Sequence, residues 1–128
     1  MLDGYRVLDL TDTDGIFCSY VLALLGATVL VVEPHTGASA RRAEPTTNAG
    51  RGLWWESYAR GKTSIALDLA SATGIERVRE LAADADFVVE AFSNEETKRY
   101  GLDYASLAAI NPRLIVVSIT PFGRSGPK

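Results

Sequence analysis

The sequence predicts an α/β fold in which helices flank an open, mostly parallel β-sheet. Short apolar segments typical of strands alternate along the chain with longer segments of helical periodicity. The strand segments are apolar almost throughout, as strands of a parallel sheet are when helices cover both faces. The chain has 128 residues, about the size of one domain, and 47% of them are hydrophobic. We therefore expect one α/β unit.

The first half of the chain predicts a strand, a helix and a second strand. Residues 5–10 (YRVLDL) form a short apolar segment that ends at a polar run and Gly15. Residues 16–25 carry no charge and precede Gly26, which suits a helix C-terminus. A helix without a polar face is expected to be buried on most sides, either in a large core of sheet and helices or against another chain. Residues 28–32 (TVLVV) predict the next strand, and the connection suits a right-handed βαβ crossover.

The middle of the chain begins with an irregular connection. Residues 34–62 contain several glycines and prolines and show no sustained period, so no regular element is expected there. Strand-like alternation resumes at 64–69 (SIALDL). Ser71 is then expected to cap an amphipathic helix, followed by a strand at 86–92 and a short helix at 103–110.

The chain ends on a strand and a loop. Residues 114–119 (LIVVSI) predict the last strand, and residues 121–128 have the glycine and proline content of a loop. Since a helix normally follows such a strand, we expect the sheet to be incomplete at its C-terminal end.

Composition excludes several kinds of site and partner. Sixteen acidic and 13 basic residues give a formal net charge of −3, so neither nucleic acid nor an anionic membrane surface is expected as a partner. Cys18 is the single cysteine, which excludes an internal disulfide, and it is expected to be an inert core thiol. His35 is the single histidine, and no metal is expected. Without a membrane-length apolar run or a signal peptide, we expect a cytoplasmic protein.

Positive charge gathers in the 34–62 connection, where five basic residues stand against two acidic ones. Such a cluster could bind an anionic ligand, because arginines bind phosphate oxygens in a bidentate way. It could equally be a solvated loop whose arginines pair with nearby carboxylates. Trp54, Trp55 and Tyr58 lie in the same segment and could either stack on a ligand ring or anchor the loop to the core.

Acidic residues at the predicted strand ends are candidate functional groups. Glu33 lies 18 residues after Gly15, near the spacing of the acid that binds an adenine ribose in dinucleotide folds. The preceding turn has one glycine where three are typical, and two aspartates that would repel a pyrophosphate. Glu33 is therefore expected to cap or pair with the following loop. Asp9, Asp68 and Glu90 are expected to have structural roles, since nothing in the sequence supplies a shifted pKa.

Six phrases taken together resemble the N-terminal part of the large domain of family III CoA-transferases, also called the CaiB/BaiF family. In order, they are GYRVLDLT (4–11), LALLGATVLVVEP (22–34), RGKTSIALDL (60–69), DFVVEAF (86–92), RYGLDYASLAAINPRLI (99–115) and SITPFGRSGP (118–127). Their order and spacing cover nearly the whole chain. The resemblance implies a Rossmann-like fold, acyl-CoA and carboxylic acid substrates, and a homodimer of interlocked chains.

The resemblance also implies which residues contact coenzyme A. Strand-end loops would approach its adenosine and pantetheine parts through the backbone of Leu67, Asp68, Leu69, Ala70, Ala91, Phe92 and Ser93. Arg42 and Arg99 would bind phosphates, with Lys62 nearby. Gly15 would line the pantetheine path, and Pro34 would lie on the adenine side.

The sequence departs from the family pattern in two loops. Residues 14–16 (Asp-Gly-Ile) stand where the family usually has Ala-Gly-Pro, and residues 90–92 (Glu-Ala-Phe) stand where it has Glu-Asn-Phe. The family's nucleophilic aspartate, which attacks the acyl-CoA thioester to form a mixed anhydride, lies further along than Lys128. No catalytic residue is therefore assigned, and the chain alone is expected to be inactive.

The resemblance implies reversible CoA transfer between carboxylic acids as the reaction of the parent protein. Two alternatives remain open. One is a parent related to the α-methylacyl-CoA racemases, and the other is a non-catalytic half that binds CoA or acts as a scaffold.

Overall fold

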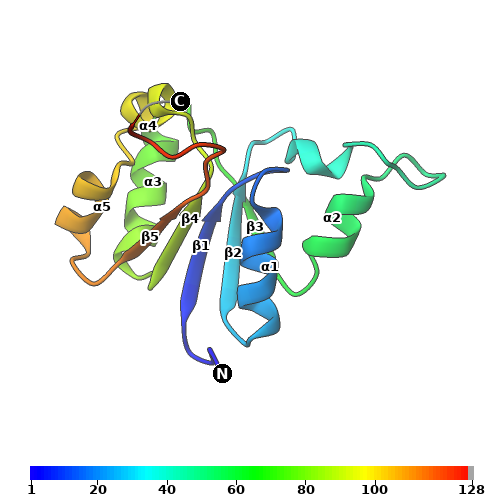
Figure 1. Cartoon of the computed structure of the whole chain (residues 1–128), viewed down its shortest axis with the longest axis horizontal. Coiled ribbons are helices and arrows are strands. Elements are labelled where there is room, and N and C mark those ends of the chain that lie inside the picture. Colours follow the sequence, from blue (N-terminus) through cyan, green and yellow to red (C-terminus); the bar gives the residue numbers. More distant parts are fainter. Residues whose placement is uncertain (127–128) are drawn as a thin grey trace.

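The computed structural model describes residues 1–126 and contains a five-stranded sheet between two layers of helices (Figure 1). The strands are β1 (Arg6–Leu10), β2 (Thr28–Glu33), β3 (Thr63–Ala66), β4 (Phe87–Glu90) and β5 (Ile115–Ser118). The helices are α1 (Ile16–Leu24), α2 (Leu53–Tyr58), α3 (Ala72–Ala83), α4 (Asn94–Tyr100) and α5 (Tyr104–Ile110), with a 3₁₀ turn at Ser39–Arg41. Residues 127 and 128, part of the expected loop 121–128, lie outside the described residues.

All neighbouring strands are parallel, in the order β3-β2-β1-β4-β5. The predicted α/β class with a parallel sheet is confirmed. The chain builds outward from β1 to β3 and then crosses to β4 on the other side of β1. The carboxyl ends of β1 and β4 therefore lie at the point where the strand order reverses, which is where parallel α/β sheets bind ligands.

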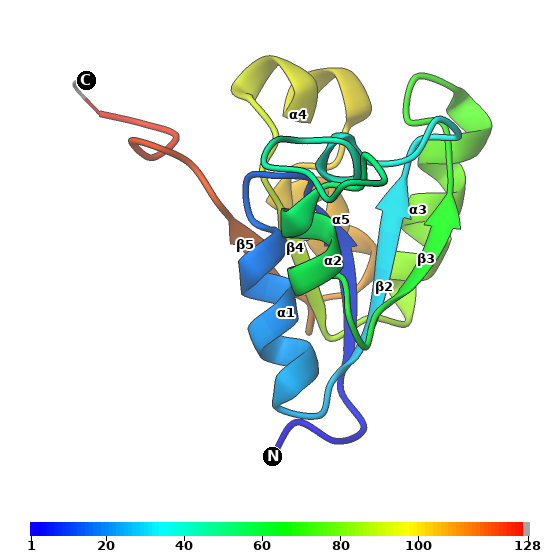
Figure 2. The same ribbon diagram turned by 90° about the vertical axis from the view of Figure 1, so that its right-hand side faces the viewer.

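Helices cover both faces of the sheet. α1 and α2 lie on one face, and α3 and α5 lie on the other (Figures 1 and 2). Strand side chains alternate between the faces, so Val7, Val29 and Val31 pack in the layer of α1, whereas Leu8 and Val32 pack in the layer of α3. Each face thus has its own apolar core, and together they hold the strand ends in fixed positions.

The expectation that 34–62 lacks regular structure is wrong. This segment contains the 3₁₀ turn and α2, whose aromatic side chains pack on α1: the ring of Tyr58 lies 5.3 Å from that of Phe17 and 5.4 Å from that of Tyr20. The guanidinium of Arg41 lies 4.0 Å from the ring centre of Trp55. Tyr58 thus anchors this segment to the domain through α1, and Trp55 does so by packing against the core on the same face of the sheet.

Within this chain the helix that begins at Ile16 is buried on one face and not on the other, so burial of the second face against another chain stays a prediction. Ile16 and Ser19 are buried, but the side chains of Phe17 and Leu24 are 56% and 66% exposed. The apolar sequence therefore leaves one face of α1 open to solvent.

No helix within residues 1–126 is long and apolar enough to cross a membrane.

Candidate functional site

A groove lies at the carboxyl ends of the central strands. Its cavity of about 360 Å³ is formed by the segments that follow the first three strands and by the start of the β4–α4 region. Its lining includes Leu10, Thr11, Asp12, Val32, Glu33, Pro34, Ala38, Leu67, Asp68, Leu69, Ala70, Phe92, Glu96 and Tyr100. We call it the strand-end groove.

The segment that follows β3 is fixed against β2 and α3. The Leu67 N–H donates to the carbonyl of Glu33 at 2.8 Å, which extends the pairing of the two strands by one residue. The Asp68 carboxylate accepts the Ala70 N–H at 2.8 Å and closes a tight turn. A Cβ on Gly74 would lie 1.9 Å from the Asp68 carbonyl oxygen, so glycine at this position lets α3 begin directly behind the turn.

Glu33, which lines the strand-end groove, is paired with Arg41. Arg41 donates to the Glu33 carboxylate through Nε at 2.7 Å and Nη2 at 2.6 Å, and the Ala38 N–H donates at 2.8 Å. The guanidinium, with the Ala38 N–H, lowers the pKa of Glu33 to about 2. The prediction that Glu33 pairs with the following loop is confirmed. One arginine of the basic segment is thereby committed to a carboxylate rather than left free for a ligand.

Asp12 ties the β1–α1 loop to the 3₁₀ turn. Its carboxylate accepts the backbone N–H groups of Ser39 and Ala40, each at 2.8 Å. These bonds hold the two loops together, and each loop contributes a residue to the groove lining, Asp12 and Ala38.

A fully buried ion pair lies beneath α1. The Lys62 Nζ lies 3.3 Å from the Asp9 carboxylate, and both side chains are 1% exposed. Lys62 also donates to the carbonyl of Ile16 at 2.9 Å and to the Ser19 hydroxyl at 2.6 Å, and Ser19 donates to Asp9. Burial lowers the pKa of Lys62, and the Asp9 carboxylate opposes that effect. The geometry gives Lys62 and Asp9 a structural role between α1 and the sheet.

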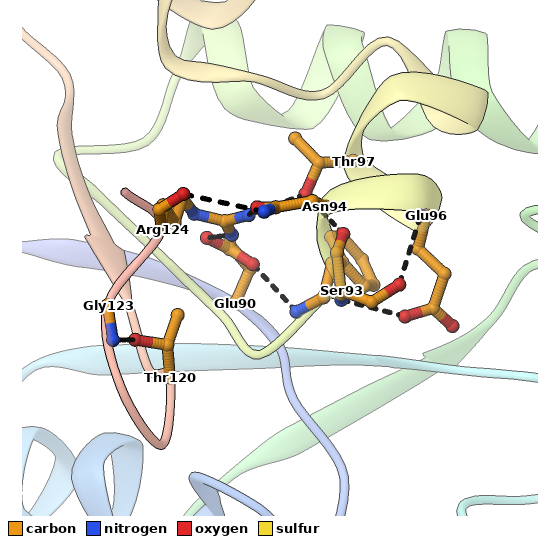
Figure 3. Close-up of polar contacts among 9 residues, drawn as sticks. Glu90, Ser93, Asn94, Glu96, Thr97, Thr120, Gly123 and Arg124 are labelled. Carbon is orange, nitrogen blue, oxygen red and sulfur yellow. Dashed lines mark hydrogen bonds and ion pairs between the residues drawn. The ribbon is translucent and has the colours of Figure 1, made fainter. Parts of the chain in front are cut away.

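Arg124 connects the loop after β5 to the end of β4 (Figure 3). Its guanidinium pairs with Glu90 and donates to Asn94 Oδ1 at 3.2 Å and Thr97 Oγ1 at 3.0 Å. The other carboxylate oxygen of Glu90 accepts the Phe92 N–H at 2.8 Å. Glu90 therefore fixes both the β4–α4 turn and the position of the following loop.

A capping box starts α4 next to this pair. The Ser93 hydroxyl accepts the Glu96 N–H at 3.1 Å, while the Glu96 carboxylate accepts the Ser93 N–H at 2.9 Å (Figure 3). These bonds lower the pKa of Glu96. The helix start is fixed by its own side chains.

The structure brings together most of the residues predicted to contact coenzyme A. Those that line the strand-end groove are Pro34, Leu67, Asp68, Leu69, Ala70 and Phe92. Arg99 and Ser93 line an adjoining cavity that shares Glu96 with the groove. Ala91 lies in the turn between Glu90 and Phe92.

Three other predicted residues lie apart from the groove lining. Arg42 is exposed at the end of the 3₁₀ turn and donates to the Thr36 carbonyl at 3.0 Å. Gly15 precedes α1 with a φ of 110°, and a Cβ there would lie 2.8 Å from Thr11 and Ile119 side-chain atoms. Lys62 is held in its buried ion pair. The residues predicted to contact coenzyme A therefore fall into two groups: those that line the groove and those that lie outside its lining.

Sequence reasoning missed Tyr100, whose ring forms part of the groove. It packs edge to face on Phe92 with ring centres 5.2 Å apart, and the Arg99 guanidinium lies 5.0 Å from its centre. The capping box at Ser93 and Glu96 was the available signal for the helix that carries it.

Among residues 1–126, no group of three or more His, Cys, Asp or Glu side chains is placed to hold a metal ion.

Comparison with known proteins identifies close relatives. The sequence model described as CoA-transferase family III matches residues 2–128. Succinate–glutarate CoA-transferase of Agrobacterium fabrum is 39% identical over 134 residues, covering 98% of this chain and 34% of that protein. Succinyl-CoA–D-citramalate CoA-transferase of Chloroflexus aurantiacus is 39% identical over 128 residues, covering 98% of this chain and 32% of that protein.

A solved structure gives the same result. The crystal structure of a CaiB/BaiF family protein from Brucella suis matches with a TM-score of 0.89 and 41% identity, covering 98% of this chain and 35% of that one. This chain therefore spans about a third of the length of these relatives.

Proposed function

Because the chain belongs to CoA-transferase family III, we propose that it forms the coenzyme A-binding part of an acyl-CoA:carboxylate CoA-transferase. The observation that carries this proposal is the strand-end groove, which six of the twelve residues predicted to contact coenzyme A line together. Four of them, Leu67 to Ala70, are consecutive, so the support comes from the meeting of three separate segments, at Pro34, Leu67–Ala70 and Phe92, in one cavity.

In the proposed arrangement the adenosine lies in the strand-end groove, against Pro34 and the Leu67–Ala70 turn. The aromatic ring of Tyr100 offers an apolar surface there for the adenine. The pantetheine arm runs along Ala91–Ser93 toward Gly15, over backbone that Glu90 holds in place. In this arrangement the groove provides a surface complementary in shape to the ligand, and the residues around it provide the positive charge for its phosphates.

Phosphates are bound at the rim by Arg42 and Arg99. Both residues are exposed, and the guanidinium of each makes one hydrogen bond within the described residues, to Thr36 and Tyr100. Free donors remain on each for phosphate oxygens. Lys62 acts from beneath as a positioning residue, because its ion pair with Asp9 holds α1 against the strand that carries the groove.

The reaction of the whole protein is reversible transfer of CoA from an acyl-CoA to a carboxylic acid. An aspartate beyond residue 128 attacks the thioester carbonyl, the CoA thiolate leaves, and a mixed anhydride forms. The thiolate then attacks the aspartyl carbonyl of the anhydride, which releases the donor carboxylate and leaves an aspartyl-CoA thioester. The acceptor carboxylate displaces the thiolate from this thioester to give a second anhydride, and attack of the thiolate on the acyl carbonyl yields the acceptor's CoA thioester and the free aspartate. The chain of 128 residues would bind coenzyme A without catalysing transfer. Names of its relatives support a transferase parent over a racemase.

We further propose that the whole protein is a cytoplasmic homodimer of interlocked chains. The open apolar face of α1, together with the half-exposed Trp54 of α2, supports an additional protein surface against this layer. The free cysteine is compatible with a reducing compartment.

Calorimetry with coenzyme A tests the binding function on the 128-residue chain. Arg99→Ala and Arg42→Ala should each weaken the affinity several-fold, because each removes a charge-assisted contact to phosphate. Arg77→Ala is the matched control, since Arg77 is an exposed arginine that pairs with Glu80 away from the groove. Unchanged affinity in both test variants would show that the phosphates bind elsewhere.

A further inference from the structure

The segment that follows β5 is held against the β4–α4 turn at several points. The Ile119 N–H donates to the Glu90 carbonyl at 2.8 Å, which continues the pairing of β5 with β4. The Asn94 side-chain amide donates to the Arg124 carbonyl at 3.4 Å, and the Arg124 guanidinium donates to the side chains of Asn94 and Thr97 (Figure 3). The loop after β5 and the start of α4 are therefore one connected unit.

Glu90 connects Arg124 to the backbone of the turn. The Glu90 side chain is 3% exposed; one carboxylate oxygen pairs with the Arg124 guanidinium, and the other accepts the Phe92 N–H at 2.8 Å. Within residues 1–126, Arg124 is the one cation that forms an ion pair with Glu90. Because a buried carboxylate that loses its counter-charge is strongly destabilised, Glu90 would turn toward water without Arg124 and release the Phe92 N–H.

The same segment also packs against the loop that precedes α1. A Cβ on Gly15 would lie 2.8 Å from the Ile119 side chain, so the backbone at Gly15 closely approaches the segment after β5. Gly15 and residues 91–93 are the two places along which the proposed function runs the pantetheine arm. Neither Ile119 nor Arg124 lines the strand-end groove, in which the adenosine is placed. The segment after β5 therefore supports the path of the arm and not the nucleoside site.

We propose that Arg124 is a positioning residue for the pantetheine arm of coenzyme A. It acts through Glu90, whose carboxylate fixes the backbone of residues 91–93 before the ligand binds. The inference rests on the proposed function, because that function places the arm along this backbone. A turn that is already ordered costs less free energy on binding than one that the ligand must order. The affinity for a ligand that carries the arm should therefore depend on Arg124.

Two ligands separate this role from a general effect on the fold. Coenzyme A carries the arm, whereas 3′-phosphoadenosine 5′-diphosphate is the same molecule without it. In calorimetry of the 128-residue chain, Arg124→Gln should lower the affinity for coenzyme A about tenfold and leave the affinity for the nucleotide unchanged. Arg124→Lys keeps a positive charge beside Glu90 and should recover part of the affinity. Arg77→Gln is the matched control, since Arg77 forms an exposed pair with Glu80, and it should change neither affinity.

Amide hydrogen exchange provides a second readout that requires no ligand. The Phe92 amide should exchange faster in Arg124→Gln than in the wild type, because its carboxylate acceptor is no longer held in place. The amides of α3 should keep their wild-type rates. An unchanged exchange rate at Phe92 would overturn the inference even if the variant bound coenzyme A poorly.

The outcomes also separate this inference from the proposed function. Unchanged affinity of Arg124→Gln for coenzyme A, or an equal loss of both ligands, would overturn the positioning role and leave coenzyme A binding intact. If the wild-type chain binds neither ligand, the proposed function fails and the positioning role fails with it. If Arg124→Gln does not fold, Arg124→Lys provides the comparison, with a smaller loss expected for coenzyme A and none for the nucleotide. A loss in Arg124→Lys that is equal for the two ligands would overturn the inference.

Discussion

Replacing Glu33 with glutamine tests whether the Glu33–Arg41 pair stabilises the domain. The pKa of Glu33 is lowered from 4.5 to about 2, which corresponds to about 3 kcal/mol of preference for the charged form in the folded state. The Arg41 side chain is 38% exposed, so water screens part of the interaction. We therefore expect Glu33→Gln to lower the free energy of unfolding at pH 7 by about 2 kcal/mol.

The same pKa fixes the pH dependence of the effect. Since the folded-state pKa lies below the unfolded one, the stabilisation is fully present above about pH 4.5 and is lost as the pH falls toward 2. Urea unfolding at pH 7, 4 and 3 should show the difference between wild type and variant shrinking as acid is added. Glu80→Gln is the control, because Glu80 forms an exposed pair with Arg77 and should cost under about 0.5 kcal/mol. Equal losses in the two variants, or a loss at pH 7 that persists undiminished at pH 3, would refute the reasoning.

Three further substitutions probe other parts of the structure. Asp9→Asn leaves Lys62 buried without a counter-charge and should lower the free energy of unfolding by about 3 kcal/mol in urea titrations, whereas the exposed Asp68→Asn should lower it by much less. Gly74→Ala places a Cβ against the Asp68 carbonyl and should cost about 2 kcal/mol; a melting temperature equal to wild type would contradict this contact. Ser93→Ala removes the capping box of α4 and should cost about 1 kcal/mol, with faster amide exchange in residues 94–97 and none of this change in α3.

Most of the sheet could be predicted because its strands are short apolar runs bounded by polar turns. The two missed helices lack such a signal for different reasons. α2 lies among glycines and prolines and is stabilised by aromatic packing on α1, which no local pattern encodes. α4 has no apolar stripe, and only its capping box marks it in the sequence.

The general place of the site was predictable because parallel strands bring their carboxyl ends to one edge of a sheet. The ion pairs that shape it were not. Arg124 lies 34 residues from Glu90, and Lys62 lies 53 residues from Asp9, so each partnership exists only after the sheet has formed. The charge pattern of the segment 34–62 shows an excess of arginine and lysine. It does not indicate which of these residues form ion pairs with buried carboxylates.

The burial of Lys62 has a practical consequence for following motions of this domain. The Lys62 Nζ is buried under α1, whereas Lys98 is exposed on α4. The two lysines therefore differ in their accessibility to amine-acylating reagents. Lys98 would be modified at once, but Lys62 would react only in molecules where α1 has lifted from the sheet. The delay between the two modifications, followed by mass spectrometry, would time the opening of the layer that lies beneath the groove.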